Sequence, residues 1–131
     1  QSKTGQIHHY IVASNRDALQ AISHKAVSLG YPVIVLDDVL QNDVIDVANL
    51  VVHTLLAGES GIYIWGAEAT VRLPENHGRG GRNQSLALAA AIKLQDVEGL
   101  YILAAGTDGT DGPGLDAGAM VDGDTVNRGE L

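Results

Sequence analysis

The sequence predicts an α/β fold, a layered domain with a mainly parallel or mixed β-sheet. Segments with strand character alternate with segments of helical periodicity along the 131 residues, as in parallel-sheet proteins. The runs "YPVIVLDD" and "LYILAAG" are short and continuously apolar, which is typical of buried strands. No internal repeat, low-complexity tract or long linker interrupts the alternation.

The first part of the chain predicts strand, helix, strand and helix in turn. Residues 7–14, "IHHYIVAS", are apolar and β-branched like a strand. The next segment has helical spacing, with Ser14 or Asn15 suited to cap it and Gly30 suited to end it. After the strand "YPVIVLDD", a second helix is expected over residues 43–57. Its apolar face comprises Val44, Val47, Ala48, Val51 and Leu55.

The second part continues the alternation. "GIYIWGAEATVRLP" is typical of two short strands or of one strand bent at Gly66. A third helix is expected over residues 84–94, buried and rigid because it is apolar nearly all round. "LYILAAG" predicts a central strand, and "TDGTDGPGLDAG" a loop. Thr125 is suited to cap a last helix.

Composition and charge narrow the possible partners. With 16 acidic and 8 basic residues the formal charge is −8, so the surface should repel nucleic acid and anionic lipid. The absence of cysteine excludes disulfides and thiolate zinc sites. No apolar run reaches the roughly 20 residues that span a bilayer, and the N-terminus lacks a signal-peptide pattern. We therefore expect a cytoplasmic protein with neither nucleic acid nor membrane as partner.

The stretch "GRGGRNQSLALAAAIKL" predicts an anion site. Glycines before a helix let the backbone approach a ligand, and the free amides of the first helical turn favour negative charge. Arg79 and Arg82 add two-donor forks for phosphate or carboxylate. The stretch is not a P-loop, since it lacks that motif's lysine. The alternative is a flexible loop whose arginines are solvated or pair with the many carboxylates of the chain.

The stretch "GTDGTDG" follows an expected strand, at the sheet edge where α/β proteins bind ligands. Thr107, Asp108 and Asp111 would lie there, and two carboxylates with a hydroxyl suit Mg²⁺. The alternative is a set of turn residues whose carboxylates cap local amides. An EF-hand is excluded because Ala119 stands where its glutamate should be.

Glu68 stands isolated among small and apolar residues in "WGAEATV". We expect it to be buried and paired with an arginine of the glycine-rich loop, because a buried carboxylate needs a partner. The histidines predict no metal site, since the adjacent His8 and His9 point to opposite faces of a strand. His77, beside the arginine loop, is expected to be solvated, the alternative being a contact with a ligand.

Three segments together carry a family resemblance. "GAEATV", "GRGGRNQSLALAAAI" and "LAAGTDGTDGPGLDAGAMVDG", in this order, closely resemble the C-terminal MOFRL region of the glycerate 2-kinase family, whose bacterial members are often labelled hydroxypyruvate reductases. The resemblance covers residues 62–128. It implies a division into residues 1–58, similar to the end of the family's preceding α/β domain, and residues 59–131, the MOFRL-like region. The chain is then truncated at both ends relative to the family.

The resemblance implies phosphoryl transfer from ATP to the 2-hydroxyl of D-glycerate, with Mg²⁺, in a cleft between two α/β domains. Arg82 and Glu68 would be catalytic, and Asp108 and Asp111 would hold the metal. Phosphate and substrate would be bound by Arg79, Gly80, Gly81, Asn83 and Thr107.

Departures from the family pattern limit what the resemblance implies. Ala67 and Ala69 stand where the family reads "GGETTV", and Leu115 replaces an aspartate, so Asp116 receives no role. The family's catalytic lysine lies in an N-terminal portion outside this sequence, so we expect the fragment alone to be inactive. Two other functions compete with the kinase. A nicotinamide-dependent hydroxypyruvate reductase should carry G-x-G-x-x-G, which "GRGGRN" does not match, and the third possibility is a non-catalytic binding module.

Overall fold

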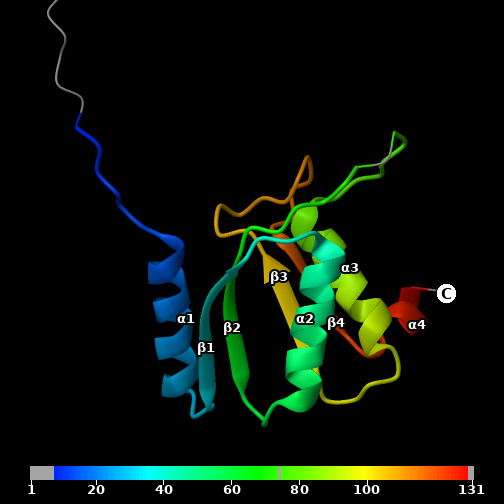
Figure 1. Ribbon diagram of the computed structural model, residues 1–131, viewed down its shortest axis with the longest axis horizontal. Coiled ribbons are helices and arrows are strands. Elements are labelled where there is room, and N and C mark those ends of the chain that lie inside the picture. Colours follow the sequence, from blue (N-terminus) through cyan, green and yellow to red (C-terminus); the bar gives the residue numbers. More distant parts are fainter. Residues whose placement is uncertain (1–7, 74, 130–131) are drawn as a thin grey trace, which may run out of the picture.

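The computed structural model describes residues 8–73 and 75–129, and it confirms the α/β class. Helices and strands alternate through most of the chain (Figure 1). The elements are α1 (Asn15–Ser28), β1 (Val33–Leu40), α2 (Val44–Ala57), β2 (Ile62–Ala67), α3 (Arg82–Leu94), β3 (Tyr101–Ala105), β4 (Gly118–Asp122) and α4 (Thr125–Gly129).

The strands form two separate pairs within the described residues. β1 and β2 are parallel, with Val33 opposite Ile62, whereas β3 and β4 are antiparallel. The expectation that residues 100–105 form a central buried strand is therefore wrong. Only one face of β3 packs on α3, and Leu103 on the other face is 70% exposed. The pairing decides this, because an antiparallel two-stranded sheet can keep one face in water.

The expected first strand is also absent. Residues 8–14 are irregular and exposed, and the segment leads away from the body of the molecule (Figure 1). Ile7 lies outside the described residues. A strand needs a neighbour for its backbone hydrogen bonds, and these residues have none among those that the structure describes. Their β-branched composition alone does not make them a strand.

Local signals placed the first two helices correctly. Ser14 caps α1 in a reciprocal capping box, accepting from the amide of Asp17 while Asp17 accepts from the amide of Ser14. Asp43 caps α2 by accepting a 3.0 Å hydrogen bond from the amide of Ile45. Gly66 lies inside β2 and marks no break; a methyl group there would collide with the Asn15 side chain, so its role is to let α1 approach.

The core joins α2, α3 and the inner face of the β3–β4 pair. α2 buries Val44, Val47, Ala48, Val51 and Val52. α3 buries Leu86, Ala87, Ala89, Ala90, Ala91 and Leu94. The expectation that α3 is buried all round is wrong, because Leu88 and Ile92 are 58% and 59% exposed. Small alanines on the inner face let the two helices pack closely.

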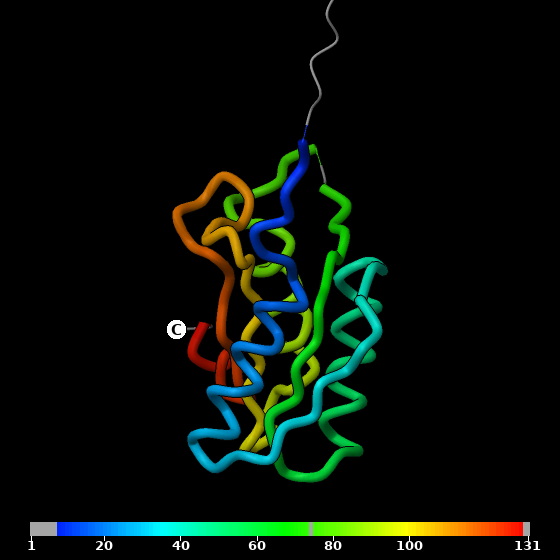
Figure 2. The backbone as a smooth tube through the Cα atoms, turned by 90° about the vertical axis from the view of Figure 1, so that its left-hand side faces the viewer, coloured from blue at the N-terminus to red at the C-terminus, as the bar shows by residue number. Residues whose placement is uncertain are grey.

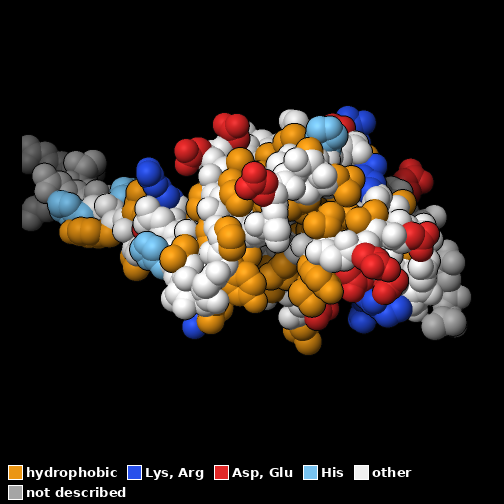
Figure 3. Space-filling model, turned by 90° about the horizontal axis from the view of Figure 1, so that it is seen from below, with side chains coloured by type: hydrophobic (Ala, Val, Ile, Leu, Met, Phe, Trp, Pro, Cys, Tyr) orange, Lys and Arg blue, Asp and Glu red, His pale blue; other side chains and the backbone are white. Residues whose placement is uncertain are grey.

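The helices lie on both sides of the β1–β2 pair. α1 contacts both strands and is nearest the viewer in Figure 2, on the side opposite α3 and the β3–β4 pair. From below, hydrophobic side chains gather across the middle of the surface, with charged side chains mostly at its margins (Figure 3). Within the described residues, no helix has the length and apolar character needed to cross a bilayer.

Candidate active site

A cavity of about 390 Å³ lies where the loops after β2 and β3 meet at the start of α3. The segment between β2 and α3 forms one wall through Val71, Leu73, His77, Gly80 and Gly81, with Arg82 and Asn83 from the first turn of α3. The loop between β3 and β4 forms the opposite wall through Gly106, Asp108, Thr110, Asp111, Gly112 and Pro113. Two motifs far apart in the sequence therefore share one cavity.

Asp111 connects the two walls. Its Oδ1 accepts a 2.9 Å hydrogen bond from the amide of Asn83, and its Oδ2 accepts a 2.8 Å hydrogen bond from the amide of Gln84. Gly81, the residue before α3, has no side chain that could cap the helix, and Asp111 supplies the cap instead. The expectation of free amides for a ligand is therefore wrong at Asn83 and Gln84, because an internal carboxylate occupies them.

Glycines allow the two walls to approach this closely. A methyl group on Gly81 would collide with the Asp111 carboxylate and with the backbone of Gly112. Gly112 has a φ of 65°, a conformation that other residues rarely adopt, and a methyl group there would collide with the carbonyl of Gly80. The glycines of both motifs thus serve contact between loops as well as any contact with a ligand.

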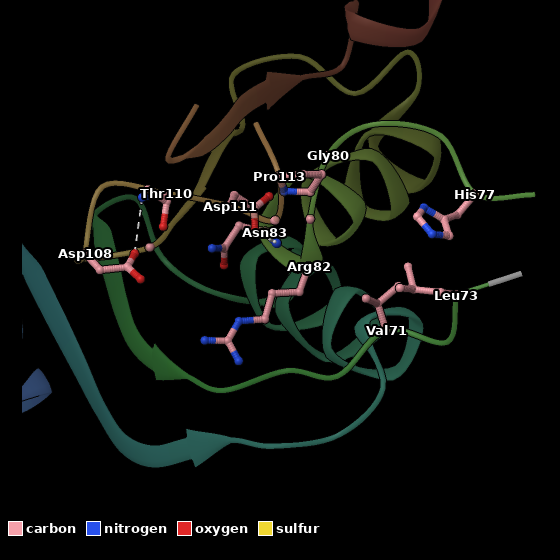
Figure 4. A pocket seen from close by; sticks show the side chains of 13 residues that line it. Val71, Leu73, His77, Gly80, Arg82, Asn83, Asp108, Thr110, Asp111 and Pro113 are labelled. Carbon is pink, nitrogen blue, oxygen red and sulfur yellow. Dashed lines mark hydrogen bonds between the residues drawn. The ribbon is translucent and has the colours of Figure 1, made fainter. Parts of the chain in front are cut away.

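Oppositely charged side chains reach the cavity from its two walls. Arg82 extends from the start of α3 with Asp108 on one side and His77 on the other (Figure 4). Both Arg82 and Asp108 are exposed, while Asn83 is partly buried. Within residues 8–73 and 75–129, the single ion pair is Arg128 with Asp122, so no internal carboxylate neutralises Arg82. The guanidinium is available for an external anion.

Asp108 differs from Asp111 in how it uses its oxygens. Its Oδ1 accepts a 3.2 Å hydrogen bond from the amide of Thr110, two residues later in the same loop. This is the local turn contact that the alternative interpretation of "GTDGTDG" predicts. Because Asp108 is exposed at the cavity, its carboxylate can still contact a cation there.

Three predicted site residues lie outside the cavity lining. Glu68, Arg79 and Thr107 are all exposed. The expectation that Glu68 is buried against an arginine is wrong, since the residue is exposed and no ion pair involving it occurs among the described residues. The backbone amide of Glu68 donates to the carbonyl of Leu40, which places this residue just beyond β2.

Sequence reasoning missed Thr110, which lines the cavity where Thr107 does not. The repeated "TDG" of "GTDGTDG" offered both threonines, and only the path of the loop selects the second. His77 was expected to be solvated; it is exposed, yet it also lines the cavity. The apolar lining by Val71 and Leu73 carried no recognisable sequence signal.

The chemistry of the lining fits Mg²⁺ with a phosphorylated ligand better than a metal held by protein alone. Mg²⁺ takes one or two carboxylates, keeps several waters and binds phosphate oxygens. Asp108 offers one accessible carboxylate. In the part of the chain that the structure describes, no group of three His, Cys, Asp or Glu side chains is arranged for a metal ion.

Comparisons with known proteins point to one family. Residues 61–130 match the MOFRL family. A glycerate 2-kinase of Pyrococcus horikoshii is 35% identical over 131 residues, an alignment covering 93% of this chain and 29% of that protein. A D-glycerate 2-kinase of Thermotoga maritima is 56% identical over 63 residues, covering 48% of this chain and 15% of that protein.

Solved structures agree with these sequence matches. The crystal structure of a glycerate kinase from Thermotoga maritima superposes with a TM-score of 0.78 at 32% identity, covering 86% of this chain and 29% of that chain. A crystal structure of a Pyrococcus horikoshii protein gives a TM-score of 0.79 at 32% identity and covers 93% of this chain and 30% of that one. The chain thus spans less than a third of the length of these relatives.

Proposed function

Because this chain belongs to the MOFRL family, we propose that it supplies one wall of the active site of a glycerate 2-kinase, which transfers the γ-phosphoryl group of ATP to the 2-hydroxyl of D-glycerate. The observation that carries the proposal is the convergence of Arg82 and Asp108 on one cavity. A cation and an anion facing one space suit a phosphate group accompanied by its metal ion. Relatives named as glycerate 2-kinases support the same activity.

Arg82 is assigned to the transferring phosphoryl group. Its planar guanidinium donates two parallel hydrogen bonds to phosphate oxygens, and it stabilises the negative charge that they carry in the transition state. Asn83, Gly80 and Gly81 adjoin it in the lining and contact the same ligand through a side-chain amide and through backbone. Three exposed residues in adjoining segments complete the assignment, with Glu68 in a catalytic role and Arg79 and Thr107 in binding phosphate and substrate.

Asp108 is assigned to the metal side of the cavity. When bound, Mg²⁺ would supply positive charge that offsets the negative charge of the phosphate groups. Asp108 would hold it directly or through water, because its carboxylate is exposed at the cavity. Asp111 also lines the cavity from the same loop, but it is buried and both of its carboxylate oxygens accept hydrogen bonds from amides of α3. The cysteine-free composition supports a cytoplasmic location for this reaction.

The decisive experiment compares two reactions in the full-length protein that contains these residues. One arm is a coupled assay for ADP release with D-glycerate, ATP and Mg²⁺, and the other follows nicotinamide oxidation with hydroxypyruvate. We expect ATP-dependent phosphorylation and no reduction. Nicotinamide-dependent reduction without kinase activity would overturn the proposal in favour of a reductase, and inactivity in both arms would favour a binding module.

The 131 residues by themselves are expected to show no kinase activity. They span about 30% of the length of the solved relatives, so the proposed cavity presents only one wall of the active site. The same coupled assay, run on the isolated segment at high protein concentration, tests this. Measurable phosphorylation of D-glycerate by the segment would contradict it.

A further inference from the structure

We propose that Asp111 is a positioning residue that fixes the two walls of the cavity and thereby sets the geometry between Arg82 and Asp108. The inference rests on the proposed function, because it concerns how the same site is assembled. It replaces the sequence-based expectation that Asp111 is a direct metal ligand with a different task for this side chain.

Burial is the first observation. Asp111 is 3% exposed and is the only charged residue that is buried within residues 8–73 and 75–129. An ionised carboxylate is costly to bury unless hydrogen bonds compensate it. Here both carboxylate oxygens accept hydrogen bonds from backbone amides, those of Asn83 and Gln84. These amides lie at the N-terminal end of α3, where the helix dipole favours a negative charge. The surroundings of Asp111 therefore hold a carboxylate, and both of its oxygens are used to cap the start of α3.

The approach of the two loops is the second observation. Asp111 reaches the amides of α3 across a surface that Gly81 leaves bare, and Gly112 packs directly against the backbone of Gly80. Any side chain at Gly81 would push Asp111 away from its two amides. Gly81, Gly112 and the Asp111 carboxylate thus form one contact between the segment before α3 and the loop after β3, which we call the joint.

The joint lies between the two functional side chains. Arg82 immediately precedes Asn83, so a carboxylate that fixes the Asn83 amide also fixes the backbone from which the Arg82 side chain extends. Asp108 belongs to the same loop as Asp111 and is tied to it through the bond between Asp108 and the amide of Thr110. A shift of the joint would move Arg82 relative to Asp108.

Asp111 and Asp108 have different roles: Asp111 holds the start of α3, and Asp108 presents a carboxylate to the metal ion. Asp108 is exposed and uses one oxygen in a local turn, whereas Asp111 is buried and directs both oxygens at amides more than 25 residues away in sequence. A metal ligand must present an oxygen to the ion and its waters. The accessible carboxylate of the pair is Asp108.

The test uses Asp111→Asn in the full-length protein. An asparagine amide has one acceptor oxygen, and its NH₂ group would face a backbone amide that also donates. We expect kcat at 25 °C to fall on the order of 10²-fold, the effect of a misplacement of about 1 Å. The Mg²⁺ concentration for half-maximal rate should stay unchanged. Asp116→Asn, at an exposed aspartate outside the cavity, is the matched control and should match wild type.

A second variant guards against a failure to fold. Gly81→Ala keeps the Asp111 carboxylate but forces it from the helix, so it should reproduce the loss of kcat with unchanged Mg²⁺ dependence. A raised Mg²⁺ requirement with kcat restored at saturating Mg²⁺ would make Asp111 a metal ligand and overturn the inference. A lowered melting temperature with kcat within about twofold of wild type would reduce Asp111 to a purely structural role and overturn it as well.

A non-catalytic readout separates this inference from the proposed function. Amide hydrogen exchange at Asn83 and Gln84 should accelerate in Asp111→Asn and stay at the wild-type rate in Asp116→Asn, whether or not the protein phosphorylates D-glycerate. Kinase inactivity of the wild-type protein would reject the proposed function while this measurement still tests the joint. Unchanged exchange at both amides would show that Asp111 does not hold α3.

Discussion

Asp111 accepts a 2.8 Å hydrogen bond from the backbone amide of Gln84, 27 residues earlier in the chain. This contact joins the two glycine-rich motifs that the sequence presents separately. It lies at the start of α3, where Arg82 begins the helix, and the loop that contains Asp111 also contains Asp108. The candidate site therefore depends on a contact between loops as much as on either motif.

Arg82→Lys should lower turnover strongly in the full-length protein. A lysine keeps the positive charge but lacks the planar two-donor fork, so it cannot reproduce a bidentate contact with a phosphoryl group. Loss of one such donor costs about 2.7–4 kcal/mol of transition-state stabilisation, or about 10²–10³-fold in kcat. Steady-state kinetics with ATP and D-glycerate measure this. The control is Arg16→Lys on α1, and near-native turnover of Arg82→Lys would leave Arg82 with a structural role only.

Asp108→Asn should raise the Mg²⁺ concentration needed for half-maximal rate. The substitution removes an anionic oxygen from the cavity but keeps a carbonyl oxygen that can accept the amide of Thr110, so the turn should survive. The melting temperature should therefore change little. Kinetics at varied Mg²⁺, together with thermal unfolding, check both parts. An unchanged Mg²⁺ dependence with a large fall in melting temperature would mean that Asp108 serves the turn alone.

Ala90→Leu should destabilise the fold. Ala90 is fully buried on the face of α3 that joins the core shared with α2, so a larger side chain would have to displace its packed neighbours. Overpacking of this kind costs about 1–3 kcal/mol, which urea or thermal unfolding can measure. The matched control on the same helix is Leu88→Ala, at a side chain that is 58% exposed, and it should cost much less. Equal losses in the two variants would contradict the packing described for α3.

Asp122 should make stability depend on pH. The hydrogen bond from the Arg128 guanidinium, followed by the one from the Thr125 hydroxyl, lowers the pKa of this carboxyl. A depressed pKa in the folded state contributes stability above the ordinary aspartate pKa, and this contribution is lost as pH falls through the folded-state pKa. Melting temperatures of wild type and Asp122→Asn should therefore differ at neutral pH and converge as pH falls below the ordinary aspartate pKa and through the lowered pKa of the folded state.

Arg128→Gln provides the control for this pH effect, since it removes the partner that lowers the pKa of Asp122. It should reproduce the loss of stability at neutral pH and flatten the pH dependence of melting. A difference between wild type and Asp122→Asn that stays constant from neutral pH down to acid unfolding would contradict the assignment.

The sequence pointed to the two motifs that meet at the cavity, but it did not determine which of their residues line it, since Arg79 and Thr107 do not and Thr110 does. Arg82 and Asp108 both line the cavity, as expected from the glycine-rich stretches that contain them. The alternation of strands and helices also predicted that one cavity-lining segment precedes α3 and that the other follows β3. Roles in catalysis and metal binding, and the division into residues 1–58 and 59–131, stay predictions.

Local signals determined the helices from the sequence alone. Capping by Ser14 and Asp43 and the apolar spacing of α2 involve residues a few positions apart, so they can be recognised without knowing which segment packs against the helix. Only the tertiary structure decided the strand pairing that leaves Leu103 exposed, the solvation of Glu68 and the burial of Asp111. Each of these depends on which distant segment packs against the residue, and spacing along the chain carries no information about that partner.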